Sequence, residues 1–165
     1  MTYIPQNESH RSRLMIIAAN KLKEYPILMK QCSMLYHYSI ELLLKGCDIW
    51  KNNRLLTIHN LCKLLKRVPF IDLNDNELKQ LRIINDYFNY RYPLSERVFE
   101  QMKATLEKNA EEEIPGTLPL PTEVSTYDLE IAENLYRNIL AAMPSELQQI
   151  YEEIGENIKN NRLLV

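Results

Sequence analysis

Three histidines are the residues of this chain best suited to acid–base chemistry: His10, His37 and His59. Histidine titrates near neutral pH and can take the proton from a ribose 2′-hydroxyl, while a nearby arginine can stabilise charge on a reacting phosphate. Arg54 precedes His59 by five residues, so these two are a pair whose residue types could do this chemistry. The alternative is that His59 only fixes the start of a helix through hydrogen bonds.

A second candidate group is His37, Glu41 and Lys45, whose spacing of four places them on one face of a helix. An exposed Glu41–Lys45 pair would contribute only about 0.3–0.5 kcal/mol. Buried charges would need partners, which Arg91 or a second copy of the chain could supply. Two interpretations stay open: a structural polar network, or a cleft where these residues bind a phosphate and tyrosines stack on a base. The neighbouring tyrosines are Tyr36, Tyr38, Tyr90 and Tyr92.

Composition excludes several classes of protein. The net charge of −2 and the pI of about 6.0 give no overall basic field for nucleic acid, although a local basic patch remains compatible with them. Three scattered glycines form no phosphate-binding loop. The three cysteines, Cys32, Cys47 and Cys62, form neither a disulfide framework nor a zinc motif, and we expect buried thiols. We expect no metal site and no cofactor.

The elements that must position these residues are helices, since no convincing alternating segment is present. Ser9 is the expected cap of the first helix and Thr57 that of the third, and Pro26 belongs in the first turn of the second helix. Asn74 or Asp75 caps the fourth helix, Ser125 or Thr126 the sixth and Ser145 the last. The expected helices are 9–24, 28–50, 58–68, 76–90, 95–113, 127–143 and 145–160.

The sequence predicts an all-α protein, an up-and-down antiparallel helix bundle forming a single domain over residues 1–165. Residues 94–124, with a proline-rich loop, look like an insertion, and residues 145–165 like a C-terminal extension. No signal pattern and no apolar run of about 18 residues is found, so we expect no membrane association and a cytoplasmic location.

Three signatures follow one another in the chain. They are Y-H-Y-S-I-E-L-L-L-K-G, with Glu41, Leu44 and Lys45; T-I-H-N-L, with Thr57, His59, Asn60 and Leu61; and R-Y-P, with Arg91, Tyr92 and Pro93. In this order they resemble the HEPN family (higher eukaryotes and prokaryotes nucleotide-binding domain). The resemblance covers residues 10–93 and extends to the helix predicted at 127–143.

The resemblance implies a bundle of four or five helices and a homodimer. Some relatives are metal-independent endoribonucleases with an R-x(4–6)-H motif, others accompany a minimal nucleotidyltransferase in toxin–antitoxin pairs, and others bind nucleotides or RNA without catalysis. Only Arg54 and His59 meet that spacing here, but Leu55 stands where a polar residue is usual, and the pair lies earlier in the chain than the family's catalytic motif.

We therefore expect a non-catalytic HEPN-like domain that binds a nucleotide, RNA or a protein partner such as a nucleotidyltransferase. The residues expected to bind the ligand are His37, Glu41, Lys45, Arg91 and Tyr92. The alternatives are a metal-independent endoribonuclease using Arg54 and His59, and a structural dimerisation module.

Overall fold

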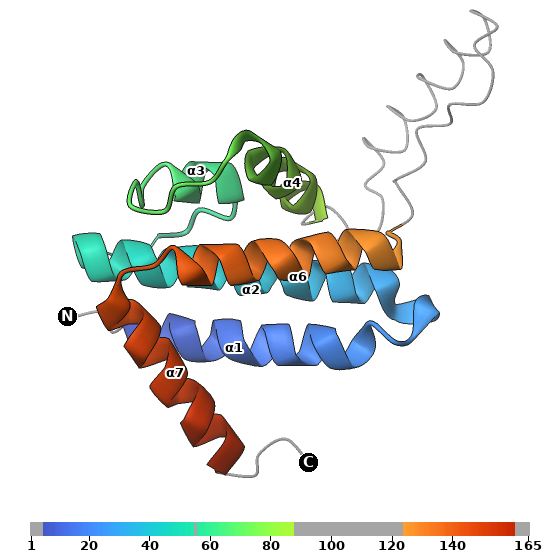
Figure 1. Cartoon of the computed structure of the whole chain (residues 1–165), viewed down its shortest axis with the longest axis horizontal. Coiled ribbons are helices and arrows are strands. Elements are labelled where there is room, and N and C mark those ends of the chain that lie inside the picture. Colours follow the sequence, from blue (N-terminus) through green and yellow to red (C-terminus); the bar gives the residue numbers. More distant parts are fainter. Residues whose placement is uncertain (1–4, 55, 88–123, 161–165) are drawn as a thin grey trace, which may run out of the picture.

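The structure, a computed structural model, describes residues 5–54, 56–87 and 124–160 of the 165-residue chain, and every regular element in these ranges is helical (Figure 1). The all-α class is therefore confirmed. The elements are α1 (Pro5–Leu22), a 3₁₀ turn (Pro26–Leu28), α2 (Met29–Asn52), α3 (Leu61–Leu65), α4 (Asp75–Asp86), α6 (Thr126–Ala141) and α7 (Ser145–Asn160). In these ranges no helix combines the length and apolar character needed to cross a bilayer.

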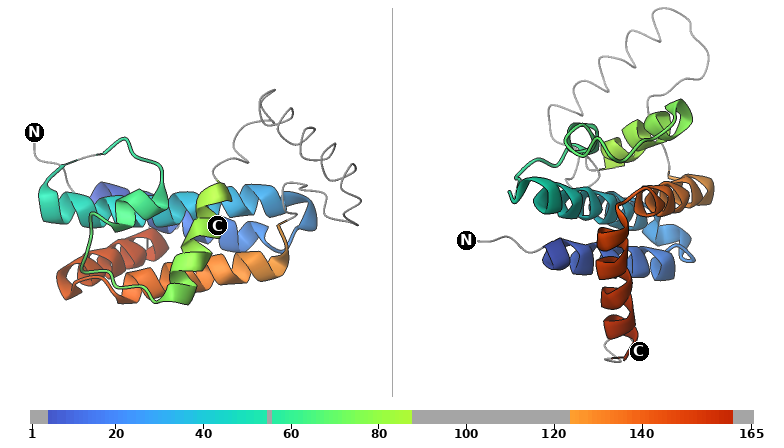
Figure 2. Two further views of the ribbon diagram at one scale, coloured as in Figure 1. Left: turned by 90° about the horizontal axis from the view of Figure 1, so that it is seen from above. Right: turned by 60° about the vertical axis from the view of Figure 1, so that its left-hand side comes forward.

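The helices form three layers, which are seen best in the right-hand view of Figure 2. The middle layer holds α2 and α6 side by side, α3 and α4 cover one side of it, and α1 with the crossing helix α7 covers the other. Helix α2 is thus packed on several sides, as its run of leucines predicts: Leu43 and Leu44 are buried.

The helix directions are visible in both figures. Helix α1 runs antiparallel to α2, whereas α6 runs in the same direction as α2 (Figures 1 and 2). The chain between α4 and α6 lies outside the described residues. The HEPN-like up-and-down order therefore stays a prediction.

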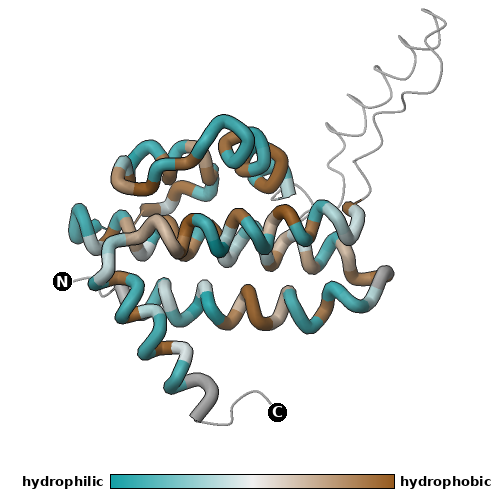
Figure 3. The backbone as a smooth tube through the Cα atoms, in the orientation of Figure 1, coloured by the Kyte–Doolittle hydropathy of each residue, from teal (hydrophilic) through white to brown (hydrophobic). Residues whose placement is uncertain are grey.

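The apolar core lies between the layers, and the hydropathy colouring of Figure 3 shows the apolar residues recurring along each helix. Burying one such leucine or isoleucine side chain contributes about 1.5–3 kcal/mol. Helix α7 is a clear case, because Leu147, Tyr151 and Ile154 are buried at spacings of four and three while Glu152 and Glu153 between them are exposed. The largest fully buried side chains of the three layers are Tyr36, Ile40, Leu43, Leu44, Leu61, Leu64, Leu81, Ile84, Leu129, Leu135, Ile139 and Leu147.

Buried hydroxyl groups fix the register of α1, α2 and α6. Ser12 Oγ donates to the Ser39 carbonyl at 2.7 Å and lies 3.1 Å from the Tyr136 hydroxyl, so one serine joins three helices. The Tyr36 hydroxyl donates to the Asn20 side chain, which lies about two turns after Ser12 on α1. This hydrogen bond joins α2 to α1 at a second point. The hydrogen bonds of Ser12 are buried, so losing a partner there would leave a buried polar atom unsatisfied.

Two helix starts were predicted correctly from their caps. The Asn74 side chain accepts from the backbone N–H of Asn76 and Glu77, and Glu77 in turn accepts from the Asn74 N–H, which completes a capping box. Ser125 and Asp128 make the same reciprocal arrangement at the start of α6. Asn74 and Ser125 are therefore the caps, rather than Asp75 and Thr126.

Other boundaries were wrong. Helix α3 is capped by Asn60 rather than Thr57 and is only five residues long, because residues 56–60 are not helical and instead return along α2. Helix α1 starts at Pro5, where proline is tolerated in the first turn, and Ser9 lies buried inside it. Ser145 is the first residue of α7, not its cap.

Pro26 begins a separate 3₁₀ turn ahead of α2. The predicted helix 95–113, most of the 94–124 insertion and the last residues of the C-terminal extension lie outside the described part of the chain.

Replacing Asn74 tests the capping box. Asn74→Ala removes the acceptor for two helix N–H groups and should lower the free energy of unfolding by about 1 kcal/mol in urea denaturation. Asn76→Ala, at an exposed position two residues later, is the control and should leave it nearly unchanged. Equal effects of the two variants would show that the box contributes nothing of its own.

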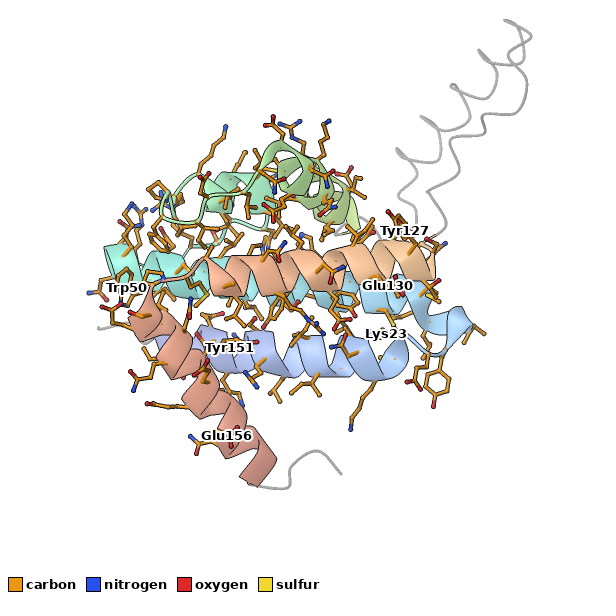
Figure 4. The ribbon with its side chains drawn as sticks, in the orientation of Figure 1. Lys23, Trp50, Tyr127, Glu130, Tyr151 and Glu156 are labelled. Carbon is orange, nitrogen blue, oxygen red and sulfur yellow. The ribbon has the colours of Figure 1, made fainter. Side chains whose placement is uncertain are left out.

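The lowered pKa of Glu133 predicts how the free energy of unfolding changes with pH. Burial alone would raise the pKa of Glu133, but hydrogen bonds and charge from Lys23, 2.7 Å away, and from Arg137 hold it below its ordinary value. A carboxyl group whose pKa is lower in the folded than in the unfolded state stabilises the fold when it is ionised. This stabilisation is complete above the unfolded-state pKa of about 4.3 and is lost as the pH falls through the folded-state pKa. Glu133→Gln should therefore flatten the acid loss of stability in urea titrations, whereas Glu130→Gln, at an exposed position on the same helix (Figure 4), should not.

Candidate functional site

A buried carboxylate, Glu41, is the centre of the polar group predicted on α2. Its side chain is only 3% exposed, and Lys45 Nζ donates to its Oε1 at 2.7 Å. His37 Nδ1 lies 3.8 Å from the other oxygen, with the His37 side chain 1% exposed. The spacing of four thus brings His37, Glu41 and Lys45 together as predicted, in the interior of the fold.

His59 joins this group from another part of the chain. Its Nδ1 lies 3.1 Å from Glu41 Oε1, although the imidazole is 48% exposed. The next residues hold the loop in place: Asn60 caps α3, and the Leu61 N–H donates to the Asn85 side chain of α4 at 2.9 Å. Two of the three sequence signatures therefore meet at one carboxylate, a contact that the spacing within either signature could not predict.

Arg54, the predicted partner of His59, lies in the exposed turn after α2. Asn53 ends that helix with φ of 47°, the left-handed conformation that asparagine tolerates, and donates its N–H to the Ile49 carbonyl at 2.7 Å. Among the described residues Arg54 has no hydrogen bond or ion pair, so the observed contact of His59 is with Glu41. The catalytic pairing of Arg54 and His59 stays a prediction.

The burial of this group bears on the two interpretations that the sequence left open. Lys45 directs its ammonium at Glu41 with a side chain only 10% exposed, so a phosphate would have to compete with a buried carboxylate for it. Such a pair has its charges already compensated, which is how a structural network is arranged. Arg91 and Tyr92, the other predicted ligand-binding residues, lie outside the described residues, so a phosphate cleft there remains a prediction.

A strongly basic stretch of sequence follows α2. Five lysines and arginines and no aspartate or glutamate occur between residues 49 and 71, in a chain whose net charge is −2. Lys51, Arg54, Lys63 and Lys66 are exposed and Arg67 is partly exposed. They lie at the end of α2 and just after it, and on α3 and just after it, and α3 packs beside α2. We call these five residues the basic surface. Counting charge in windows along the chain would have found it, whereas the overall charge conceals it.

Asp48 and Trp50 border the basic surface. The Asp48 carboxylate, with a side chain 1% exposed, accepts from the Asn52 amide at 2.6 Å within α2. It also accepts from Arg67 Nε at 3.1 Å, and this contact fastens the end of α3 to α2.

Trp50 is 41% exposed at the end of α2 (Figure 4) and meets the Phe70 ring edge-on, with the centroids 5.8 Å apart. A half-exposed indole beside cations is a surface on which a nucleobase can stack.

No group of three or more His, Cys, Asp and Glu side chains in the described ranges could hold a metal ion. Comparison of the sequence with protein-family models, with curated proteins and with solved structures gives no match. The HEPN resemblance therefore depends on the three sequence signatures alone.

The Glu41 network predicts a characteristic pattern of stability. Glu41→Gln leaves the buried Lys45 ammonium without its counter-charge and should lower the free energy of unfolding by about 3–5 kcal/mol. The double variant Glu41→Gln, Lys45→Met removes both charges at similar volume and should recover a large part of that loss. Urea denaturation measures both effects. A change within about 0.5 kcal/mol for Glu41→Gln, as for an ordinary surface substitution, would mean that the pair is not buried as described.

Proposed function

We propose that this chain is a HEPN-like helical domain that binds single-stranded RNA through its basic surface without cleaving it. The observation that carries the proposal is the basic surface itself: five cations, with no acid in the sequence between residues 49 and 71, bordered by the half-exposed Trp50. Within the described residues, only Arg67 among the five is paired, with the buried Asp48. Cations contact the phosphates of a single strand, and an exposed aromatic ring stacks on a base, without any preference for sequence.

The buried Glu41 network supports a positioning role for His59 in this proposal. Glu41 holds the imidazole at 3.1 Å, at the point where the chain turns into α3. Lys63 and Lys66 are three residues apart on α3 and its end, so they share one side of it. Anchoring the loop therefore also orients these two cations. Catalysis would further require an arginine held beside the imidazole, and Arg54 makes no hydrogen bond or ion pair with a described residue.

A second candidate is the metal-independent endoribonuclease, which one observation favours. A carboxylate that accepts a hydrogen bond from Nδ1 keeps a histidine in the tautomer whose Nε2 can act as a base. Glu41 and His59 have this arrangement, with the imidazole half exposed. The homodimer, a nucleotide ligand and a nucleotidyltransferase partner stay predictions.

RNA binding can be tested by reversing charges on the basic surface. The double variant Arg54→Glu, Lys63→Glu should weaken binding of a fluorescent single-stranded RNA about tenfold or more, since two phosphate contacts are lost. The slope of log K against log salt should also become shallower by about 1.4. Lys21→Glu, at an exposed position on α1, is the control and should change neither. Equal binding by all three proteins, or no binding by any, would overturn the proposal.

Cleavage is a separate measurement. The wild-type protein should leave a mixed RNA pool intact in EDTA, which removes metal-dependent contaminants. Cleavage by the wild type that disappears in His59→Ala would establish the endoribonuclease candidate instead. Cleavage that persists in both His59→Ala and Arg54→Ala would exclude this pair as its source.

A further inference from the structure

A cleft of about 350 Å³ opens where α1, α6 and α7 meet, and the predicted site does not use it. It lies away from the basic surface, since α1 and α7 form the layer opposite α3 and α4 (Figures 1 and 2). The residues that line it and matter here are Arg13 from α1, Arg137 and Leu140 from α6, and Gln148, Tyr151 and Glu152 from α7.

Arg13 is held in this cleft by several contacts. Its guanidinium carbon lies 4.9 Å from the centroid of the Tyr151 ring, and Nη1 donates to the Tyr151 carbonyl at 3.3 Å. Gly155, one turn further along α7, leaves the space that it occupies: a Cβ added there would lie 2.2 Å from the guanidinium carbon. The absence of a side chain at Gly155 is therefore what lets the charged end of Arg13 lie against α7.

Within the part of the chain that the structure describes, the charge of Arg13 has no counter-charge in contact with it. No carboxylate of the described residues lies within ion-pair distance of Arg13, although its side chain is partly buried. The other arginine, Arg137, pairs with Glu133, but Glu133 is shared with Lys23. Among the described residues that line the cleft, Glu152 is the one acid, so the lining carries two arginines and one glutamate.

The remaining walls suit an organic group. Leu140 and the Tyr151 ring are apolar. The volume is at the small end of the range for ligand pockets. A small anion with a compact apolar body matches these dimensions.

We propose that the cleft between α1, α6 and α7 binds a small organic phosphate monoester, with Arg13 and Arg137 contacting the phosphate. Guanidinium groups bind phosphate oxygens through paired hydrogen bonds. A phosphate monoester carries close to two negative charges and three acceptor oxygens, so it can balance two guanidinium groups on different helices, whereas a carboxylate carries one charge. The inference is independent of RNA binding, because it uses neither the basic surface nor the Glu41 network.

The test is calorimetric titration of the full chain with phenyl phosphate. The wild type should bind it saturably, with a dissociation constant of about 1 mM or below. Arg13→Gln should weaken binding at least about tenfold. Arg11→Gln removes the same charge from the solvent-exposed side of α1, two residues away, and should not weaken it. Absence of saturable binding, or equal losses in the two variants, would overturn the proposal.

Three further titrations separate phosphate binding in the cleft from misfolding, from binding of any anion and from binding at the basic surface. Gly155→Ala displaces the flexible end of Arg13 while keeping its charge, so it should weaken binding as Arg13→Gln does. It therefore tests the cleft independently if Arg13→Gln folds poorly.

Benzoate tests the ligand class, and binding as tight as that of phenyl phosphate would overturn the phosphate assignment. Arg54→Glu, Lys63→Glu should bind phenyl phosphate like the wild type, and a loss there would place the anion on the basic surface instead.

Discussion

The burial of Glu41 inside α2 is the constraint on which much of the structure depends. Helix α2 is packed between two layers, so a charge on its buried faces must find its partners within the protein. Lys45 supplies one from the next turn, and His59 supplies another from the loop that follows the helix. That loop must therefore return along α2 before α3 begins, which shortens α3 to Leu61–Leu65 and sets the direction in which its lysines point.

On the opposite side of the middle layer, neutral groups rather than charges join the helices through buried hydrogen bonds. Ser12 joins the Ser39 carbonyl and the Tyr136 hydroxyl, and so sets the register of α1, α2 and α6 without a buried charge. The register also places Arg13, the next residue, where α7 crosses α1. Because α7 has glycine at 155, the guanidinium fits against this helix and contributes to an open cleft rather than to a closed packing contact.

The two surfaces with excess positive charge thus arise from different causes. The basic surface is a property of a continuous stretch of sequence, fastened to α2 by the contact of Arg67 with Asp48. The Arg13 cleft is made by residues from three helices that are distant in the chain. A ligand at one need not affect the other, since the middle layer of α2 and α6 lies between them (Figure 2).

The helical class and the helix starts at Asn74 and Ser125 could be predicted because capping and helical periodicity depend on neighbours within a few residues. Thr57 was the wrong cap because the path of residues 56–60 depends on the contact of His59 with Glu41, 18 positions earlier. The sequence by itself determined that His37, Glu41 and Lys45 share a helix face, but it could not determine that this face is buried. Only the tertiary structure decided that burial, the anchoring of His59 and the meeting of Arg13 with Tyr151 across 138 positions. The reason is that these contacts depend on how whole helices pack, and no short-range pattern encodes them.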